Sequence, residues 1–240
     1  MELAPGIRRL GNGTVNVYLV AEPGGVTVVD AGLPGQWSEL LHELAAIGRT
    51  IADVRAVVLT HGHTDHIGFA ERARRERSIP IQVHELDAAL ARGEAPNPAR
   101  GVGRVRPLPL LRFLVYAARL GGLRTPHVSV VSTFGDGATL DVPGSPRVVL
   151  VPGHTPGSAA LHLPDRGALF VGDAFATYAV TSGEHAPQVA PFTADAATAV
   201  ASLDRLEPLD VPLALPGHGE PWTAGIAEAV RRVRERPLPG

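Results

Sequence analysis

The stretch Thr60-His61-Gly62-His63-Thr64-Asp65-His66-Ile67-Gly68 places three imidazoles and one carboxylate within six residues. It follows the mostly aliphatic run 54–59, which is typical of a buried strand. The chance that His-x-His-x-Asp-His arises somewhere in this chain is on the order of one in a thousand. Because imidazole is the commonest protein ligand for a borderline metal cation, this loop is predicted to bind metal.

A metal-ligand residue also stands at the end of three further predicted strands. These ends are Pro152-Gly153-His154, Gly172-Asp173 and Pro216-Gly217-His218. Alternate residues of an extended loop can converge on one ion while their neighbours turn to a second ion. Together with the loop 60–68, these ends supply seven candidate ligands, a number that suits two metal ions: His61, His63, Asp65, His66, His154, Asp173 and His218.

The rest of the chain alternates short strands with helices. The runs 14–20 and 26–30 flank the turn signal Glu22-Pro23-Gly24-Gly25 and predict a hairpin. We interpret 1–240 as a single domain with an insertion at about 92–127, which is rich in Pro and Arg at first and then apolar and helical. The insertion is either a lid over the metals or an interface between two copies of the chain. Helical spacing of apolar residues predicts helices over 34–47, 68–77, 108–120, 194–206 and 223–234.

Composition narrows the class of partner. With 22 basic and 24 acidic residues, the formal net charge is −2, which argues against nucleic acid and against a membrane as partners. The chain has no cysteine, so any metal must be held by His and carboxylate side chains. No apolar run reaches the ~18 residues of a membrane span, and no secretory signal opens the chain. We therefore expect a cytoplasmic enzyme that acts on a small-molecule substrate.

Five motifs in order resemble those of the metallo-β-lactamase-fold hydrolases, the superfamily that includes glyoxalase II, acyl-homoserine lactonases and RNase Z. The similarity runs from about Thr14 to Trp222. It implies an α/β fold in which two mixed sheets pack between outer helices, a four-layer αββα sandwich. The motifs are Val28-Val29-Asp30-Ala31-Gly32, the loop 60–68, Pro152-Gly153-His154-Thr155-Pro156-Gly157-Ser158, Phe170-Val171-Gly172-Asp173 and Pro216-Gly217-His218-Gly219.

The resemblance also implies a role for each ligand. It assigns His61, His63 and His154 to a first ion and Asp65, His66 and His218 to a second, with Asp173 bridging them. Zinc is the expected metal, and the ligand set also suits iron or manganese. Asp30 would lie behind the ligands and orient an imidazole or the ligand loop through a hydrogen bond.

A dinuclear site of this kind implies hydrolysis. Two divalent ions lower the pKa of a shared water from ~15.7 toward ~7, so that a metal-bridging hydroxide can attack an ester, thioester or lactone carbonyl. Asp65 or Asp173 would pass the proton to the leaving group. Tyr178, five residues after Asp173, is a candidate to polarise the carbonyl.

Other readings of the motifs stay open. A mononuclear iron enzyme that resembles the persulfide dioxygenases would share the early motifs, and a binding protein without catalysis could keep the fold. Lactam cleavage is disfavoured because the cysteine-containing ligand sets are excluded and the histidine-only set lacks a bridging aspartate. Phosphodiesterase activity is also less favoured. Only 22 residues follow His218, and we expect them to be too few for the glutathione-binding helices of glyoxalase II.

Overall fold

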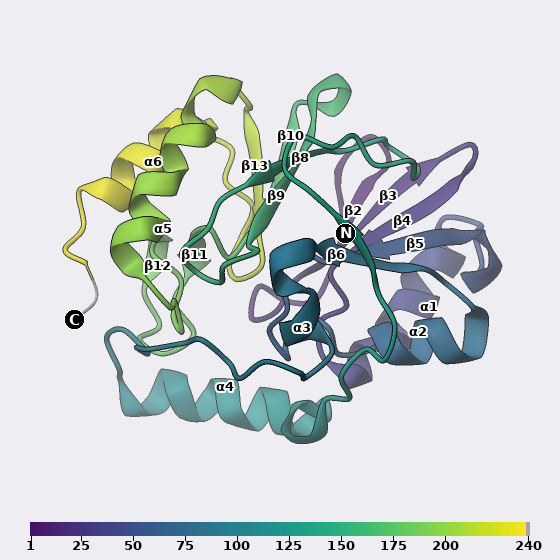
Figure 1. Cartoon of the computed structure of the whole chain (residues 1–240), viewed down its shortest axis with the longest axis horizontal. Coiled ribbons are helices and arrows are strands. Elements are labelled where there is room, and N and C mark those ends of the chain that lie inside the picture. The colour runs from purple at the N-terminus through teal and green to yellow at the C-terminus, as the bar shows by residue number, and fades with distance from the viewer. Residues whose placement is uncertain (239–240) are drawn as a thin grey trace.

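Two β-sheets face each other at the centre of the computed structural model, which describes residues 1–238 (Figure 1). The first sheet has the strand order β1-β2-β3-β4-β5-β6-β7, the second has the order β13-β10-β9-β8, and β11 and β12 form a separate hairpin. The first sheet contains β1 (Glu2–Ala4), β2 (Ile7–Leu10), β3 (Val17–Glu22), β4 (Gly25–Val29), β5 (Val54–Val58), β6 (Ile81–His84) and β7 (Ser132–Phe134). The other strands are β8 (Arg147–Leu150), β9 (Ala159–Leu163), β10 (Ala168–Gly172), β11 (Ala176–Tyr178), β12 (His185–Gln188) and β13 (Leu213–Pro216).

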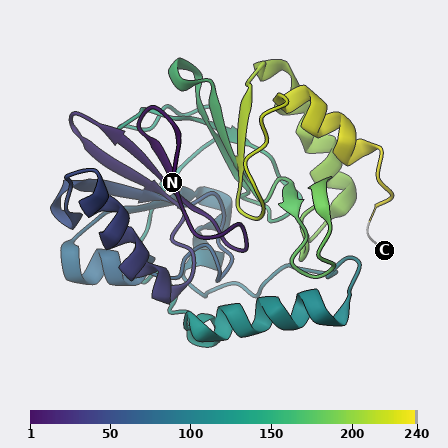
Figure 2. The ribbon, with the colours of Figure 1, turned by 180° about the vertical axis from the view of Figure 1, so that it is seen from behind.

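Helices cover the outer faces of both sheets. The helices α1 (Trp37–Ala46) and α2 (Ala70–Arg77) lie on the first sheet, and α5 (Ala196–Ser202) and α6 (Ile226–Arg234) lie on the second (Figures 1 and 2). The short helix α3 (Ala88–Ala91) follows β6, and α4 (Pro107–Arg119) stands apart from both sheets. This arrangement confirms the predicted αββα sandwich.

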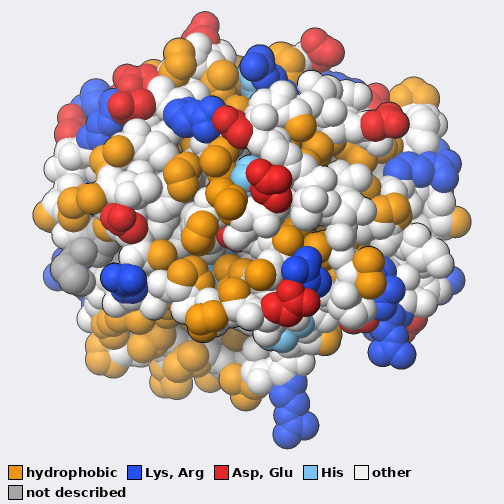
Figure 3. Space-filling view, in the orientation of Figure 1, with side chains coloured by type: hydrophobic (Ala, Val, Ile, Leu, Met, Phe, Trp, Pro, Cys, Tyr) orange, Lys and Arg blue, Asp and Glu red, His pale blue; other side chains and the backbone are white. Residues whose placement is uncertain are grey.

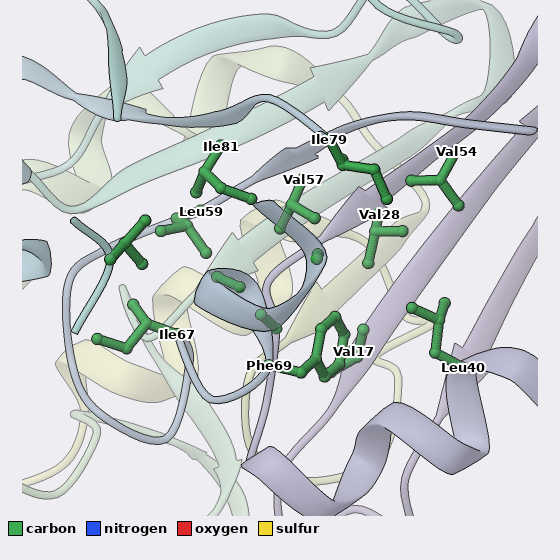
Figure 4. Close-up of a cluster of buried hydrophobic side chains, with 14 of the residues drawn as sticks. Val17, Val28, Leu40, Val54, Val57, Leu59, Ile67, Phe69, Ile79 and Ile81 are labelled. Carbon is green, nitrogen blue, oxygen red and sulfur yellow. The ribbon is translucent and has the colours of Figure 1, made fainter. Parts of the chain in front are cut away.

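Three clusters of buried apolar side chains hold the four layers together. The first joins the first sheet to α1 and α2, and Figure 4 shows part of it, where Val28 and Val57 gather with Phe69. The second lies between the sheets, where the rings of Tyr18 and Phe170 are 5.3 Å apart at their centroids. The third joins the second sheet to α6. Burial of these apolar faces is the main favourable term in the stability of the sandwich.

Strand direction brings the polar loops to one edge of the sandwich. β3 and β4 form the predicted antiparallel hairpin, and β4, β5, β6 and β7 then run parallel to one another. In the second sheet, β10 runs parallel to β13. Because parallel strands end at the same edge, the loops after β4, β5 and β6 meet there, as do those after β10 and β13.

The segment 92–127 crosses from the first half of the molecule to the second and back. Its helix α4 spans the lower edge of the view in Figure 1. The Arg106 amide before the helix donates to the Thr181 carbonyl at 2.9 Å, and the Gly35 amide donates to the Leu120 carbonyl after the helix at 2.8 Å. The helix is therefore anchored at both ends. Within residues 1–238, no helix combines the length and the apolar character that crossing a membrane requires.

Candidate metal centre

The seven predicted ligands come together where the strands end. Their donor atoms form three overlapping groups, and within each group the atoms lie within 4.8 Å of one another. All seven side chains are buried except Asp65, which keeps 22% of its side-chain surface exposed. Which group holds which ion stays a prediction. The first group is His61 with His63 and His154, the second is Asp65 with His66 and His218, and the third, which overlaps both, is His61 with His66 and Asp173.

Unpaired polar atoms show that these residues fit a divalent cation. Within residues 1–238, His61 Nε2, His66 Nε2 and Asp173 Oδ1 are buried without a hydrogen-bond partner. A buried polar atom without a hydrogen-bond partner destabilises the folded protein by about 1–3 kcal/mol. Three such atoms in one cluster therefore indicate a binding site for a ligand. A metal ion, which accepts lone pairs from nitrogen and carboxylate oxygen, meets that need.

Gly217 leaves room for this centre. A Cβ at this position would lie 2.4 Å from Asp173 Oδ1 and 2.5 Å from His66 Cε1. Any other residue would push one of these ligands away. The glycine before His218 is therefore explained by the close approach of the ligands to the backbone.

Hydrogen bonds fix the orientation of His61 and His66. The Thr60 hydroxyl donates to Asp30 Oδ2 at 2.9 Å, so the same hydroxyl accepts a bond from His61 Nδ1 at 3.0 Å. His66 Nδ1 donates directly to Asp30 Oδ2, also at 2.9 Å. Each Nε2 lone pair is thereby left for a metal. Asp30 thus makes the predicted contact with a ligand imidazole, and through Thr60 it reaches a second imidazole.

The other three imidazoles are held in the same way. His154 Nδ1 lies 3.0 Å from Thr193 Oγ1, whose hydroxyl donates to the Ala190 carbonyl. His218 Nδ1 donates to the Thr14 carbonyl, and His63 Nε2 lies 3.1 Å from Asn97 Oδ1. His63 Nδ1 and His154 Nε2 are then two acceptor atoms only 2.9 Å apart, which repel each other unless a cation lies beside them.

Asp87 is a structural support of the centre that the sequence analysis did not identify. This fully buried carboxylate accepts bonds from the Gly62 amide at 2.7 Å, the Gly157 amide at 2.7 Å and the Thr155 hydroxyl at 2.8 Å. Gly62 belongs to the His61–His66 loop, whereas Thr155 and Gly157 belong to the His154 loop. Asp87 therefore ties together two ligand loops that come from different sheets.

The pKa values divide the imidazoles into two kinds. Burial lowers the pKa of His61 and of His63, and it lowers the pKa of His154 to about 3. These three imidazoles are neutral at pH 7, and a neutral imidazole is the form that binds metal. The first predicted ligand group therefore needs no deprotonation before it binds an ion.

His66 and His218 have the opposite shift. Burial opposes the charged form of His66, but Asp30, Asp173 and Asp65 outweigh it and raise the pKa of His66 to about 10. The pKa of His218 is also raised, because Asp173 and Asp65 outweigh the effect of its burial. In the metal-free protein, protons on these imidazoles balance the buried carboxylates, and a metal ion must displace them.

We expect the two ion positions to respond differently to pH. Between pH 6.5 and 8.5, zinc affinity at the second group should rise by at least about 100-fold, tenfold per pH unit for the His66 proton alone, while affinity at the first group changes little. Competition titrations with a chromophoric chelator at several pH values would measure both affinities. If the affinities of the two ions changed equally with pH, the two donor groups would not differ in protonation as predicted.

The same proton affects the stability of the metal-free protein. Because the pKa of His66 is raised in the folded state, its contribution is fully present below pH 6.5 and is lost as the pH rises toward about 10. Urea unfolding of the chelator-treated protein at increasing pH would follow this loss.

Tyr178 stands beside the cluster rather than in it. Its ring, on β11, packs against the ring of His185 with the centroids 4.6 Å apart. Within residues 1–238, the phenol of Tyr178 makes no hydrogen bond to any of the seven predicted ligands. The preceding residue, Thr177, bonds the His218 carbonyl through its amide at 3.0 Å. The role of Tyr178 in polarising a carbonyl stays a prediction.

Comparison with known proteins agrees with this fold and donor set. The family model for the metallo-beta-lactamase superfamily matches residues 10–218. A Bacillus subtilis protein named probable metallo-hydrolase YflN is 30% identical over 241 residues, with 92% of this chain and 87% of that protein covered.

Two solved structures are also similar. The metallo-beta-lactamase family protein TTHA1429 from Thermus thermophilus has a TM-score of 0.70 and 25% identity, with 95% of this chain and 78% of that chain covered. The protein TTHA1623, solved in a di-iron-bound form, has a TM-score of 0.62 and 27% identity, with 91% and 94% covered. This chain therefore belongs to the metallo-beta-lactamase superfamily. Its family and its cluster of His and Asp donors support a metal-dependent hydrolase.

Proposed function

We propose that this protein is a dinuclear metal-dependent hydrolase that cleaves an ester, thioester or lactone bond, with zinc as its metal. The observation that carries the proposal is the second donor group, Asp65, His66 and His218, next to the first. Asp173 lies between them: its Oδ2 is 3.4 Å from His154 Nε2 and 3.2 Å from His218 Nε2. A carboxylate shared in this way is suited to bridging two ions.

When bound, the ions supply a nucleophilic hydroxide from water at neutral pH and polarise the carbonyl under attack. The protein orients its donor atoms through the hydrogen bonds of Asp30, Thr193 and Asn97. Asp65 is the ligand best suited to proton transfer, because its carboxylate is partly exposed and 3.5 Å from His218 Nε2. Although burial raises the pKa of Asp65, His66 and His218 outweigh that effect and lower it, so the carboxylate is ionised at neutral pH and free to accept the proton that it would pass to the leaving group.

An apolar wall beside the centre favours an acyl substrate. Phe113 of α4 faces Phe192, with ring centroids 6.5 Å apart, and Phe192 directly precedes Thr193, the partner of His154. Burial raises the pKa of Tyr116, on the same face of α4, to about 12, so its phenol stays neutral. The Phe113–Phe192 ring pair thus lies next to Thr193, the support of a predicted ligand, which favours contact with the acyl part of a substrate.

A panel of substrates together with metal analysis tests the proposal. Protein purified without chelator should contain about two zinc ions per chain and should hydrolyse aryl esters, thioesters or lactones in preference to phosphodiesters and lactams. One iron per chain, together with oxygen uptake on a persulfide, would identify the dioxygenase instead. An intact metal content without turnover of any substrate class would favour a binding protein.

We expect Phe113 and Tyr116 of α4 to determine which acyl chain length the enzyme prefers. We expect Phe113→Ala/Tyr116→Ala to raise KM more for longer acyl substrates than for acetyl substrates, because each methylene removed from water contributes about 0.8 kcal/mol. Metal content should not change. Steady-state kinetics over a series of acyl chain lengths would measure the effect. Equal KM changes at every chain length would place the substrate elsewhere.

A further inference from the structure

Helix α4 presents an apolar face that nothing in the described chain covers. Seven of the twelve exposed large apolar residues among residues 1–238 lie between 102 and 123. Leu108 and Leu111 at the start of the helix are 56% and 57% exposed, and Leu114 and Val115 are 48% and 40% exposed. Figure 3 shows apolar side chains gathered along the lower edge of the molecule, where Figure 1 places α4. Such a patch marks an interaction surface.

The charge of this region is strongly one-sided. The stretch 95–134, here called the basic segment, contains six arginines and no acidic residue, within a chain whose net charge is −2. The small net charge of the whole chain therefore conceals a basic region. Arg104 and Arg106 of this segment pair with Glu184. Within residues 1–238, Arg112, Arg119 and Arg124 have no carboxylate within ion-pairing distance, so their charges are free to meet an external anion.

The arginines and the apolar residues share one side of the helix. Spacings of three and four residues place Leu108, Arg112, Val115 and Arg119 in one row, with Leu111 and Leu114 in the adjacent row. All six side chains are exposed. The opposite side of α4 carries Phe113 and Tyr116, which face the body of the protein. A helix with one apolar face bordered by cations is typical of segments that lie in the interface of a membrane.

We propose that α4 docks the protein on an anionic phospholipid surface. In this arrangement Leu111 and Leu114 enter the boundary between headgroups and acyl chains, while Arg112 and Arg119 contact lipid phosphates. A second copy of the chain fits less well, because a two-fold contact centred on α4 would bring arginines of both copies together with no acid in the basic segment to pair with them. The proposal concerns docking alone and does not depend on the bond that the metal centre cleaves.

Vesicle flotation tests the proposal on the full-length protein. Vesicles of phosphatidylcholine with about a third phosphatidylglycerol should bind the protein, vesicles of phosphatidylcholine alone should bind it far less, and added salt should weaken binding. Arg112→Gln/Arg119→Gln should weaken binding by roughly 25-fold, about fivefold for each arginine. Leu111→Ser/Leu114→Ser should weaken it by roughly tenfold or more.

A matched control separates this surface from charge in general. Arg75 and Arg77 are exposed on α2 and have no ion pair within the described residues, so Arg75→Gln/Arg77→Gln removes the same charge from another helix. The control should bind like the parent, and all variants should keep the parent melting temperature and zinc content. Equal loss of binding in the control would overturn the proposal, as would absence of binding to the anionic vesicles. Sedimentation analysis tests the alternative. If the protein is a dimer that Leu111→Ser/Leu114→Ser dissociates, and it does not bind vesicles, then α4 forms a contact between two copies instead.

Discussion

Asp173→Ala is expected to reduce hydrolytic activity by roughly 10³-fold or more and to lower metal content from about two ions per chain to about one. The Asp173 carboxylate is buried, with its Oδ2 within 3.4 Å of both His154 Nε2 and His218 Nε2. Its other oxygen has no hydrogen-bond partner among residues 1–238 and lies 3.8 Å from His66 Nε2. Removing this side chain takes a shared negative charge from between two donor groups. The affinity for metal should therefore fall at both predicted ion positions.

Activity on the best substrate of the panel and elemental analysis of the purified variant would measure these effects. Asp165→Ala is the matched control, because Asp165 is an exposed aspartate close by in the sequence. The control should keep the activity and metal content of the parent. An Asp173→Ala variant that kept two ions and full turnover would show that Asp173 does not bridge.

Asp87→Ala should lower the melting temperature by roughly 10 °C or more and weaken metal retention. The substitution leaves the amides of Gly62 and Gly157 and the hydroxyl of Thr155 buried without their acceptor. Each such loss costs about 1–3 kcal/mol, and each kcal/mol lowers the melting temperature by about 2–4 °C for a domain of this size. The two ligand loops would also lose their common support.

Calorimetry of the metal-loaded and chelator-treated forms would separate the two effects. Asp87→Asn keeps one acceptor oxygen and should give an intermediate loss, whereas Asp141→Ala changes an exposed aspartate and should have no effect. If Asp87→Ala destabilised the protein but left zinc affinity at its parental value, the carboxylate would support the fold without positioning the ligands.

Much of the site could be predicted because its residues follow strands at one edge. The hairpin, five α-helices and the strand before the ligand loop were predicted within a few residues. The density of His and Asp after those strands marked the ligands. Parallel pairing of β4, β5 and β6 and of β10 with β13 then brings the strand ends together.

The supports of the ligands were harder to find because they are isolated polar residues. Asn97 and Thr193 stand in irregular segments and reach their imidazoles only through the fold. Asp87 carried a weak signal, since it is an acid three residues after the end of a predicted strand at the same edge. The strands β9 (Ala159–Leu163) and β12 (His185–Gln188) were missed because neither alternates clearly between apolar and polar residues.

Asp30 directly follows β4 with a φ of +63°, a conformation rare for residues other than glycine, and from there its carboxylate accepts a bond from His66 and reaches His61 through Thr60. His61 belongs to the first donor group and His66 to the second, so we expect a change in the bonding of either to reach the other through Asp30 and Thr60. In the proposed dinuclear centre, binding of the two ions is therefore expected to be thermodynamically coupled. Occupation of one position would then alter the affinity of the other, with the same coupling free energy whichever ion arrives first.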